Sequence, residues 1–243
     1  MTKNPHRLNF ELDTELDDAL ITGHAGIPLV IEMFRATGGS EAADELLQRK
    51  KKNIGLSPSQ MLEGMFALWA SGGERCDDLE HFRKDLALSQ LIGFVPPSAQ
   101  TARDFFDKFH REGAPTIWKS ERCSIPEEST FLSGLAEVNR IIVDHVQSRN
   151  TQPIATIDMD AVIVECDKRD ARTTYEGTRG YQPVVAFWAE QELILADEYR
   201  DGNIPAGCGN LRVLKKALAN LPTFVTEINL RMDSAGHEND LMD

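Results

Sequence analysis

Apolar residues follow a helical spacing in the first 150 residues of the chain and an extended spacing after them. Leu62, Met65, Phe66 and Trp69 recur every three or four positions, which is typical of one buried face of a helix. After residue 150, consecutive and alternating apolar residues replace this spacing, and such runs favour buried strands. The pattern therefore predicts a helical N-terminal part followed by a part built around a sheet.

Capping residues mark the helices of the first part. Ser57, Pro58 and Gln60 form a capping box with proline at the first helical position, and glycines follow the apolar run that they open. Ser40 and Ser98 occupy similar positions before two other helical runs. We predict helices over 26–37, 41–52, 58–71, 77–92, 99–112 and 133–149.

The last short helix before residue 113 follows the turn at Pro96 and Pro97. Three short helices joined by tight connections fit a small domain of the helix-turn-helix type. The outward polar residues of this last helix are candidate DNA contacts, and a polar face of an ordinary helix bundle has the same pattern. The candidates are Gln100, Thr101, Arg103 and Lys108.

The segment 151–165, TQPIATIDMDAVIVE, organises the second part of the chain. It is a buried-strand pattern that contains Asp158 and Asp160, and an unpaired charged acid in such a run is costly to bury. A second strand pattern, 224–232, leads directly into Asp233. Strands that deliver aspartates at their ends build metal-dependent phosphoryl-transfer sites, although turn residues at strand ends give the same spacing.

Two further strands are predicted between these segments. The runs 183–189 and 192–196 are separated by so few residues that they must pair antiparallel. A helix beginning near Asn210 precedes the strand that leads to Asp233. The predicted order is three strands, a helix and a fourth strand.

Composition narrows the class of protein. The net charge of −13 argues against DNA binding over the whole surface, because phosphate affinity rests on clustered Lys and Arg, and leaves only a local basic face. The four cysteines have no zinc-binding spacing and are predicted to be free thiols. Without an apolar run long enough to span a membrane, and with no secretory signal, we expect a cytoplasmic protein.

Several sequence motifs resemble the insertion-sequence DDE transposases of the bacterial family numbered thirteen-eighty. ATIDMDA, YEG with GYQP, FWAEQELILADEYRDGNIPAG and INLRMDSAGH follow one another in the second part, and GGERCDDLEHFRKDLALSQLIGF and SAQTARDFFDKFH lie in the first. The resemblance implies an α/β (α+β) fold with a helical, DNA-binding domain over 1–113 and a linker with a lead-in helix over 114–150. A ribonuclease-H-like core with a mixed sheet is implied over 151–243.

The resemblance also implies a divalent-metal site. Two ions, Mg²⁺ or Mn²⁺, would serve phosphodiester cleavage and strand transfer at the terminal inverted repeats of the element. Asp160 matches the first acid, with Asp158 as the alternative because residues two apart on a strand face the same side, and Asp233 matches the second. The implied partner is double-stranded DNA; no membrane is implied, and a homo-oligomer is left open.

The third acid of such sites is a glutamate on a helix well downstream of the fourth strand. The sequence ends at Asp243, and Glu238 is too close to Asp233 for that role. We therefore expect a C-terminally truncated transposase that is inactive in cleavage.

Two other functions remain as alternatives. IATIDMDAVIV also resembles the first motif of haloacid-dehalogenase-type phosphatases, with Asp158 as nucleophile and Asp160 as general acid and base. That fold requires alternating βα units and a parallel sheet, which the short strand connections disfavour. The second alternative is a non-catalytic protein that binds element ends and inhibits transposition.

Overall fold

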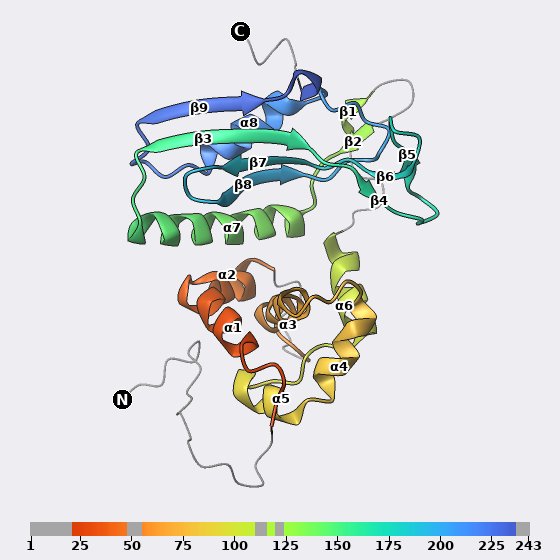
Figure 1. Ribbon diagram of the computed structural model, residues 1–243, viewed down its shortest axis with the longest axis vertical. Coiled ribbons are helices and arrows are strands. Elements are labelled where there is room, and N and C mark those ends of the chain that lie inside the picture. The colour runs from red at the N-terminus through yellow and green to blue at the C-terminus, as the bar shows by residue number, and fades with distance from the viewer. Residues whose placement is uncertain (1–20, 48–54, 110–115, 120–123, 237–243) are drawn as a thin grey trace. The chain divides into compact units, whose positions relative to one another are not determined.

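The computed structural model describes residues 21–47, 55–109, 116–119 and 124–236 (Figure 1). The chain divides into two compact units. The helical unit comprises Met1–Arg111 with Ser129–Ile142, and the sheet unit comprises Glu112–Glu128 with Val143–Asp243. In the described part of the chain, no helix has the length and apolar character needed to cross a membrane.

The helical unit consists of short helices around one apolar core. Ile31, Leu68, Leu79 and Leu88 are almost fully buried in this core. The helices are α1 (Ile27–Ala36), α2 (Gly39–Leu46), α3 (Pro58–Ala70), α4 (Leu79–Arg83), α5 (Leu86–Ile92), α6 (Ala99–Phe106) and the first part of α7 (Thr130–Arg149), with 3₁₀ turns at Cys76–Asp78 and Asp107–Phe109.

Local capping chemistry explains where these helices begin. The capping box predicted for α3 is present, since the Ser57 hydroxyl accepts from the N–H of Gln60 and the Gln60 side chain accepts from the N–H of Ser57. Ser40 does not cap α2 as predicted: Gly38, in a left-handed conformation, precedes the helix, and the Ser40 hydroxyl donates to Glu63 instead. The end of that predicted helix, 48–52, lies outside the described residues.

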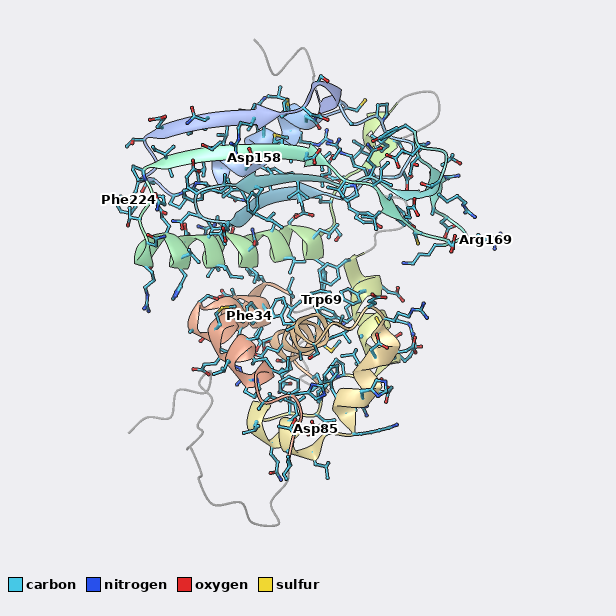
Figure 2. The ribbon with its side chains drawn as sticks, viewed as in Figure 1. Phe34, Trp69, Asp85, Asp158, Arg169 and Phe224 are labelled. Atoms are coloured by element: carbon cyan, nitrogen blue, oxygen red, sulfur yellow. The ribbon has the colours of Figure 1, made fainter. Side chains whose placement is uncertain are left out.

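The single helix predicted over 77–92 is two helices, α4 and α5. Asp85 separates them, because its carboxylate accepts a hydrogen bond from the N–H of Leu88 at 2.8 Å and so begins a new helix. The hydroxyl of Thr22 donates to the same carboxylate at 2.5 Å. Figure 2 labels Asp85 at this junction.

We predict that Asp85→Ala destabilises the helical unit by about 1 kcal/mol, the usual cost of losing an N-cap. Burial alone would raise the pKa of Asp85, but the donors at Leu88 and Thr22 favour the charged carboxylate and hold its pKa below the ordinary value. The stabilisation is therefore complete above the unfolded carboxyl pKa of about 3.9 and is lost as the pH falls through the lower folded pKa.

Urea titrations at neutral pH and below about pH 4 measure both effects. Asp85→Asn is the matched control, because it keeps an accepting oxygen without the charge and is expected to retain most of the stability at neutral pH. A neutral-pH midpoint unchanged in Asp85→Ala would contradict the role of this cap.

A buried ion pair ties four helices of the helical unit together. Glu63, which is 1% exposed, accepts from Nε and Nη2 of Arg35 at 2.8 and 2.6 Å. Its Oε1 also accepts from the hydroxyl of Ser40 at 2.8 Å, and Nη2 of Arg35 donates to the carbonyl of Ile92 at 3.0 Å. These contacts join α1, α2, α3 and the end of α5.

The sheet unit contains a mixed four-stranded sheet in the order β8-β7-β3-β9 (Figure 1). Its strands are β3 (Ile154–Ala161), β7 (Val184–Trp188), β8 (Leu193–Glu198) and β9 (Glu227–Met232), and α8 (Asn210–Ala219) lies between β8 and β9 in the sequence. β7 pairs antiparallel with β3 and β8, whereas β9 pairs parallel with β3. The predicted order of three strands, a helix and a fourth strand is confirmed within this sheet, and the fold is of the α/β class.

At β3 and β7, one face of this sheet is buried and the other is at least partly exposed. Along β3, Ala155, Ile157 and Met159 are buried in a core that includes Trp188 of β7 and Val213 of α8. The alternate residues of β3, which include both of its aspartates, are partly or fully exposed. The acids therefore avoid the burial that the apolar sequence run suggested.

Two smaller sheets complete the sheet unit. The strand predicted over 151–165 ends at Ala161, and β4 (Val164–Glu165) leaves to form a second sheet of order β4-β6-β5 with β5 (Arg172–Thr173) and β6 (Arg179–Tyr181). The strands β5 and β6 lie in the sequence between the first two long strands, β3 and β7. In the predicted linker, β1 (Thr116–Lys119) and β2 (Ser124–Pro126) pair antiparallel.

Candidate active site

The register of β3 and β9 brings two of the predicted acids together. The two strands run parallel, with Ile154 opposite Glu227 and Met159 opposite Met232. Asp160 directly follows Met159 in β3, and Asp233 directly follows Met232, the last residue of β9. They therefore lie side by side at the carboxyl ends of neighbouring parallel strands.

An ion pair lies two residues before these aspartates on the two strands and marks one face of the sheet. Asp158 lies opposite Arg231, whose Nε and Nη2 donate to the two carboxylate oxygens of Asp158 at 2.5 and 2.6 Å. Figure 2 shows Asp158 on β3. Because side chains alternate along a strand, Asp160 follows on the same face as this pair, and Asp233 is the first residue after β9.

The charges of both acids affect the pKa of the Tyr175 hydroxyl. Tyr175 lies in the turn between β5 and β6 and is 75% exposed. The charge of Glu176, burial and then the charges of Asp233 and Asp160 raise the pKa of Tyr175. The effect of both aspartates on one hydroxyl agrees with the position that the strand register gives them.

Each aspartate of the pair accepts a hydrogen bond from the backbone, and neither is paired with a basic side chain of the described residues. The Asp160 carboxylate accepts from the N–H of Ala161 at 2.8 Å, and Oδ1 of Asp233 accepts from the N–H of Gly236 at 2.8 Å. Within the described residues, neither carboxylate forms an ion pair with Lys, Arg or His. Two adjacent negative charges repel each other, so this site favours a cation that neutralises both.

The donor set suits a hard divalent cation. Mg²⁺ and Mn²⁺ prefer oxygen ligands, and Mg²⁺ is commonly held by one or two carboxylates with water and phosphate oxygens in the other positions. Among the described residues, no three His, Cys, Asp or Glu side chains gather into a possible metal cluster. This part of the chain therefore offers the two carboxylates of Asp160 and Asp233.

Asp158, the alternative first acid, has a different environment. The hydrogen bonds from Arg231 hold the pKa of Asp158 below its usual range, against a smaller opposing effect of burial. Its negative charge is already balanced by a guanidinium within the protein. The geometry therefore favours Asp160 over Asp158 as a metal ligand.

The phosphatase hypothesis does not fit this arrangement. It needs a parallel sheet of alternating βα units, whereas β3 pairs antiparallel with β7, and β7 with β8. It also needs Asp158 as a free nucleophile, and Arg231 occupies both oxygens of that carboxylate.

The four predicted DNA contacts lie together on α6 and the turn after it, in the helical unit. Each has a partner in that unit: Gln100 donates to Asp104 at 2.7 Å, and the hydroxyl of Thr101 lies 2.8 Å from that of Ser98. Nη2 of Arg103 donates to Asp77 at 2.5 Å, and Nζ of Lys108 lies 5.4 Å from the ring centroid of Phe105. Acidic neighbours thus offset part of the positive charge of this face.

Sequence reasoning missed the polar residues that support the acids. Arg231 could be assigned to Asp158 only with the register of two strands 73 positions apart in the sequence. Glu198, Arg200 and Asn210 form a buried network behind Asp233. The sequence gives no signal for this network, because Glu198 and Arg200 are charged and burial along β8 does not alternate regularly.

Comparison with known proteins assigns a family. A family model described as "Transposase DDE domain group 1" matches residues 7–243, which includes both units. No curated protein and no solved structure matches the chain.

Proposed function

The chain belongs to the DDE transposases of domain group 1, and we propose that Asp160 and Asp233 are the metal-binding acids of its site. DDE transposases generally use divalent metal ions. The observation that supports the proposal is the parallel register of β3 and β9, in which Met159 lies opposite Met232 and each of them is followed by one of the two aspartates. Mg²⁺ or Mn²⁺ bound there would stabilise the attacking and leaving oxygens of a phosphodiester displacement.

The residues of this chain would hold and orient the reacting groups. Asp160 and Asp233 provide oxygen ligands, and the exposed Arg231 guanidinium stays paired with Asp158. We infer that the substrate is double-stranded DNA at the terminal repeats of an insertion element.

Metal-dependent nicking of a duplex that carries the terminal repeats of the element tests this function. Sequence-specific binding of that duplex, metal binding and nicking that depends on the metal are the expected results. Nicking that persists after the metal is removed would overturn the proposed metal site. Sequence-specific retardation without any metal binding would favour the non-catalytic inhibitor.

We propose that α6 contributes to DNA binding, and the double variant Arg103→Ala with Lys108→Ala tests this role. Loss of two phosphate contacts should weaken binding to all duplex sequences and reduce the slope of log affinity against log salt by about 2. The fold should persist, because the Arg103–Asp77 pair is exposed and such pairs contribute little stability.

Electrophoretic retardation over a series of salt concentrations gives that slope. Arg140→Ala is the control, since Arg140 lies on α7 in an exposed pair with Glu137 and is expected to leave the salt slope unchanged. Equal slopes for the parent chain and the double variant would remove α6 from the DNA interface.

A further inference from the structure

A short turn after β9 holds the carboxylate of Asp233. This turn, Ser234–Gly236, folds back so that the N–H of Gly236 donates to Oδ1 of Asp233 at 2.8 Å. The carbonyl of the same buried glycine accepts from Nδ2 of Asn210 at 2.8 Å. Gly236 therefore links an amide side chain at the start of α8 to a proposed metal ligand.

The contacts of Asn210 fix the orientation of its amide. Nδ2 donates to the carbonyls of Ala206 and Gly236, and Oδ1 accepts from Nη1 of Arg200 at 3.2 Å. A guanidinium only donates and a carbonyl only accepts, so rotating the amide by half a turn would break all three contacts. Asn210 is 2% exposed, and water cannot readily replace these partners.

A buried ionic network supports Asn210 from behind. Arg200, which is 2% exposed, donates from Nε to Glu198 at 2.7 Å. Arg212 donates to both oxygens of the same carboxylate at 2.8 and 2.7 Å. Burial would raise the pKa of Glu198, but the two guanidinium groups outweigh it and hold the pKa below its ordinary value, so the carboxylate stays charged. The amide is thus anchored to fixed charges.

We propose that Asn210 is a positioning residue that orients the Asp233 carboxylate through Gly236. The inference rests on the proposed metal site. A Cβ placed on Gly236 would lie 3.4 Å from Oδ1 of Asp233 and 3.6 Å from Nδ2 of Asn210, so both groups converge on this one residue. Without the Asn210 donor, the Gly236 carbonyl loses a buried partner and the adjoining turn is free to shift. Metal ligands tolerate such displacements poorly, because affinity depends on their orientation.

Two variants separate the donor of Asn210 from its acceptor. Asn210→Asp keeps an oxygen for Arg200 but sets a second oxygen against the carbonyls of Ala206 and Gly236. Asn210→Ala removes both groups without adding charge, so it also controls for the added charge of Asn210→Asp. Both are expected to lower Mn²⁺ affinity, measured by calorimetry, by about 10- to 100-fold, the usual effect of losing a residue that orients a metal ligand.

Asn220, which follows the C-terminal end of α8, provides matched controls on the same helix. Its Nδ2 donates to the carbonyl of Leu195 at 2.7 Å, so Asn220→Asp and Asn220→Ala lose a comparable amide contact. These variants are expected to lower the melting temperature while leaving Mn²⁺ affinity unchanged. A purely structural role for Asn210 would give the same result at both asparagines.

The ¹H–¹⁵N signal of the Gly236 amide in the metal-free chain is a second readout. It should shift in the Asn210 variants and stay in place in the Asn220 variants. Parental Mn²⁺ affinity in the Asn210 variants would overturn this inference and leave the proposed function standing. If the parent chain binds no Mn²⁺, the proposed metal site fails, and the Gly236 signal alone tests the role of Asn210. A shift confined to the Asn210 variants would support the link from Asn210 to Asp233. An unmoved signal would overturn that link.

Discussion

Asp160→Asn and Asp233→Asn are each expected to lower Mn²⁺ or Mg²⁺ affinity by on the order of 100-fold or more. The basis is that residues which merely orient a metal ligand already change affinity by about 10- to 100-fold, and these substitutions remove a ligand charge itself. Each variant leaves a single carboxylate beside a neutral amide, so the repulsion that favours a bound cation disappears. Calorimetric titration with Mn²⁺ measures the loss.

Asp158→Asn is the matched control for both substitutions. It removes a carboxylate from the same face of the same strand, two residues from Asp160, but that carboxylate is bound to Arg231. We expect metal affinity within about twofold of the parent, because a nearby charge that is paired and partly exposed acts weakly through solvent. A large loss of affinity in Asp158→Asn, with Asp160→Asn unaffected, would transfer the role of the first acid to Asp158.

The sequence pattern was sufficient to predict the four long strands of the sheet, although the strand predicted over 151–165 ends at Ala161. The apolar runs marked β3, β7, β8 and β9, and the short connections required antiparallel pairing of β7 with β8. The position of Asp233 directly after a strand could also be predicted, because an apolar run stops there. These features depend only on residues that are near one another in the sequence, so the local pattern of apolar and polar residues is enough to predict them.

Features that depend on distant partners could not be predicted in this way. Asp158 and Asp160 face the same side of β3. Their environments differ only because the neighbouring strand β9 places Arg231 beside Asp158. The break between α4 and α5 depends on Asp85 as a cap, within a run that otherwise continues the helical spacing. The apolar pattern also gave no sign of the polar contacts of Asn210, since amide side chains carry no periodic signal.

Glu63→Ala is expected to destabilise the helical unit by about 3–5 kcal/mol, the usual result of removing one partner of a buried ion pair. The Glu63 carboxylate accepts three hydrogen bonds, and its loss leaves the Arg35 guanidinium, whose side chain is 10% exposed, without a counter-charge. An arginine guanidinium is effectively always protonated in proteins, so Arg35 stays charged in the variant and cannot avoid the cost by losing a proton.

Urea denaturation followed by circular dichroism measures this loss, with Glu137→Ala as the control. Glu137 belongs to the same unit, but its pair with Arg140 is 41% and 37% exposed, so a change of less than about 1 kcal/mol is expected. Similar losses in the two variants would show that burial of the Arg35–Glu63 pair does not govern its contribution.

Replacing both charges tests whether the pair itself is stabilising or only its disruption is costly. Arg35→Met with Glu63→Leu should recover much of the loss seen in Glu63→Ala, because apolar groups of similar volume often replace a buried ion pair at little cost. Recovery should be incomplete, since the fully buried Ser40 hydroxyl loses its acceptor and the Ile92 carbonyl loses its donor. Adding Ser40→Ala removes the first of these unsatisfied groups. The free energy of unfolding should then rise by about 1–3 kcal/mol more, the usual cost of a buried polar group without a partner. A triple variant no more stable than the double variant would show that the Ser40 hydroxyl finds another partner, and that the contribution of the pair lies in the charges alone.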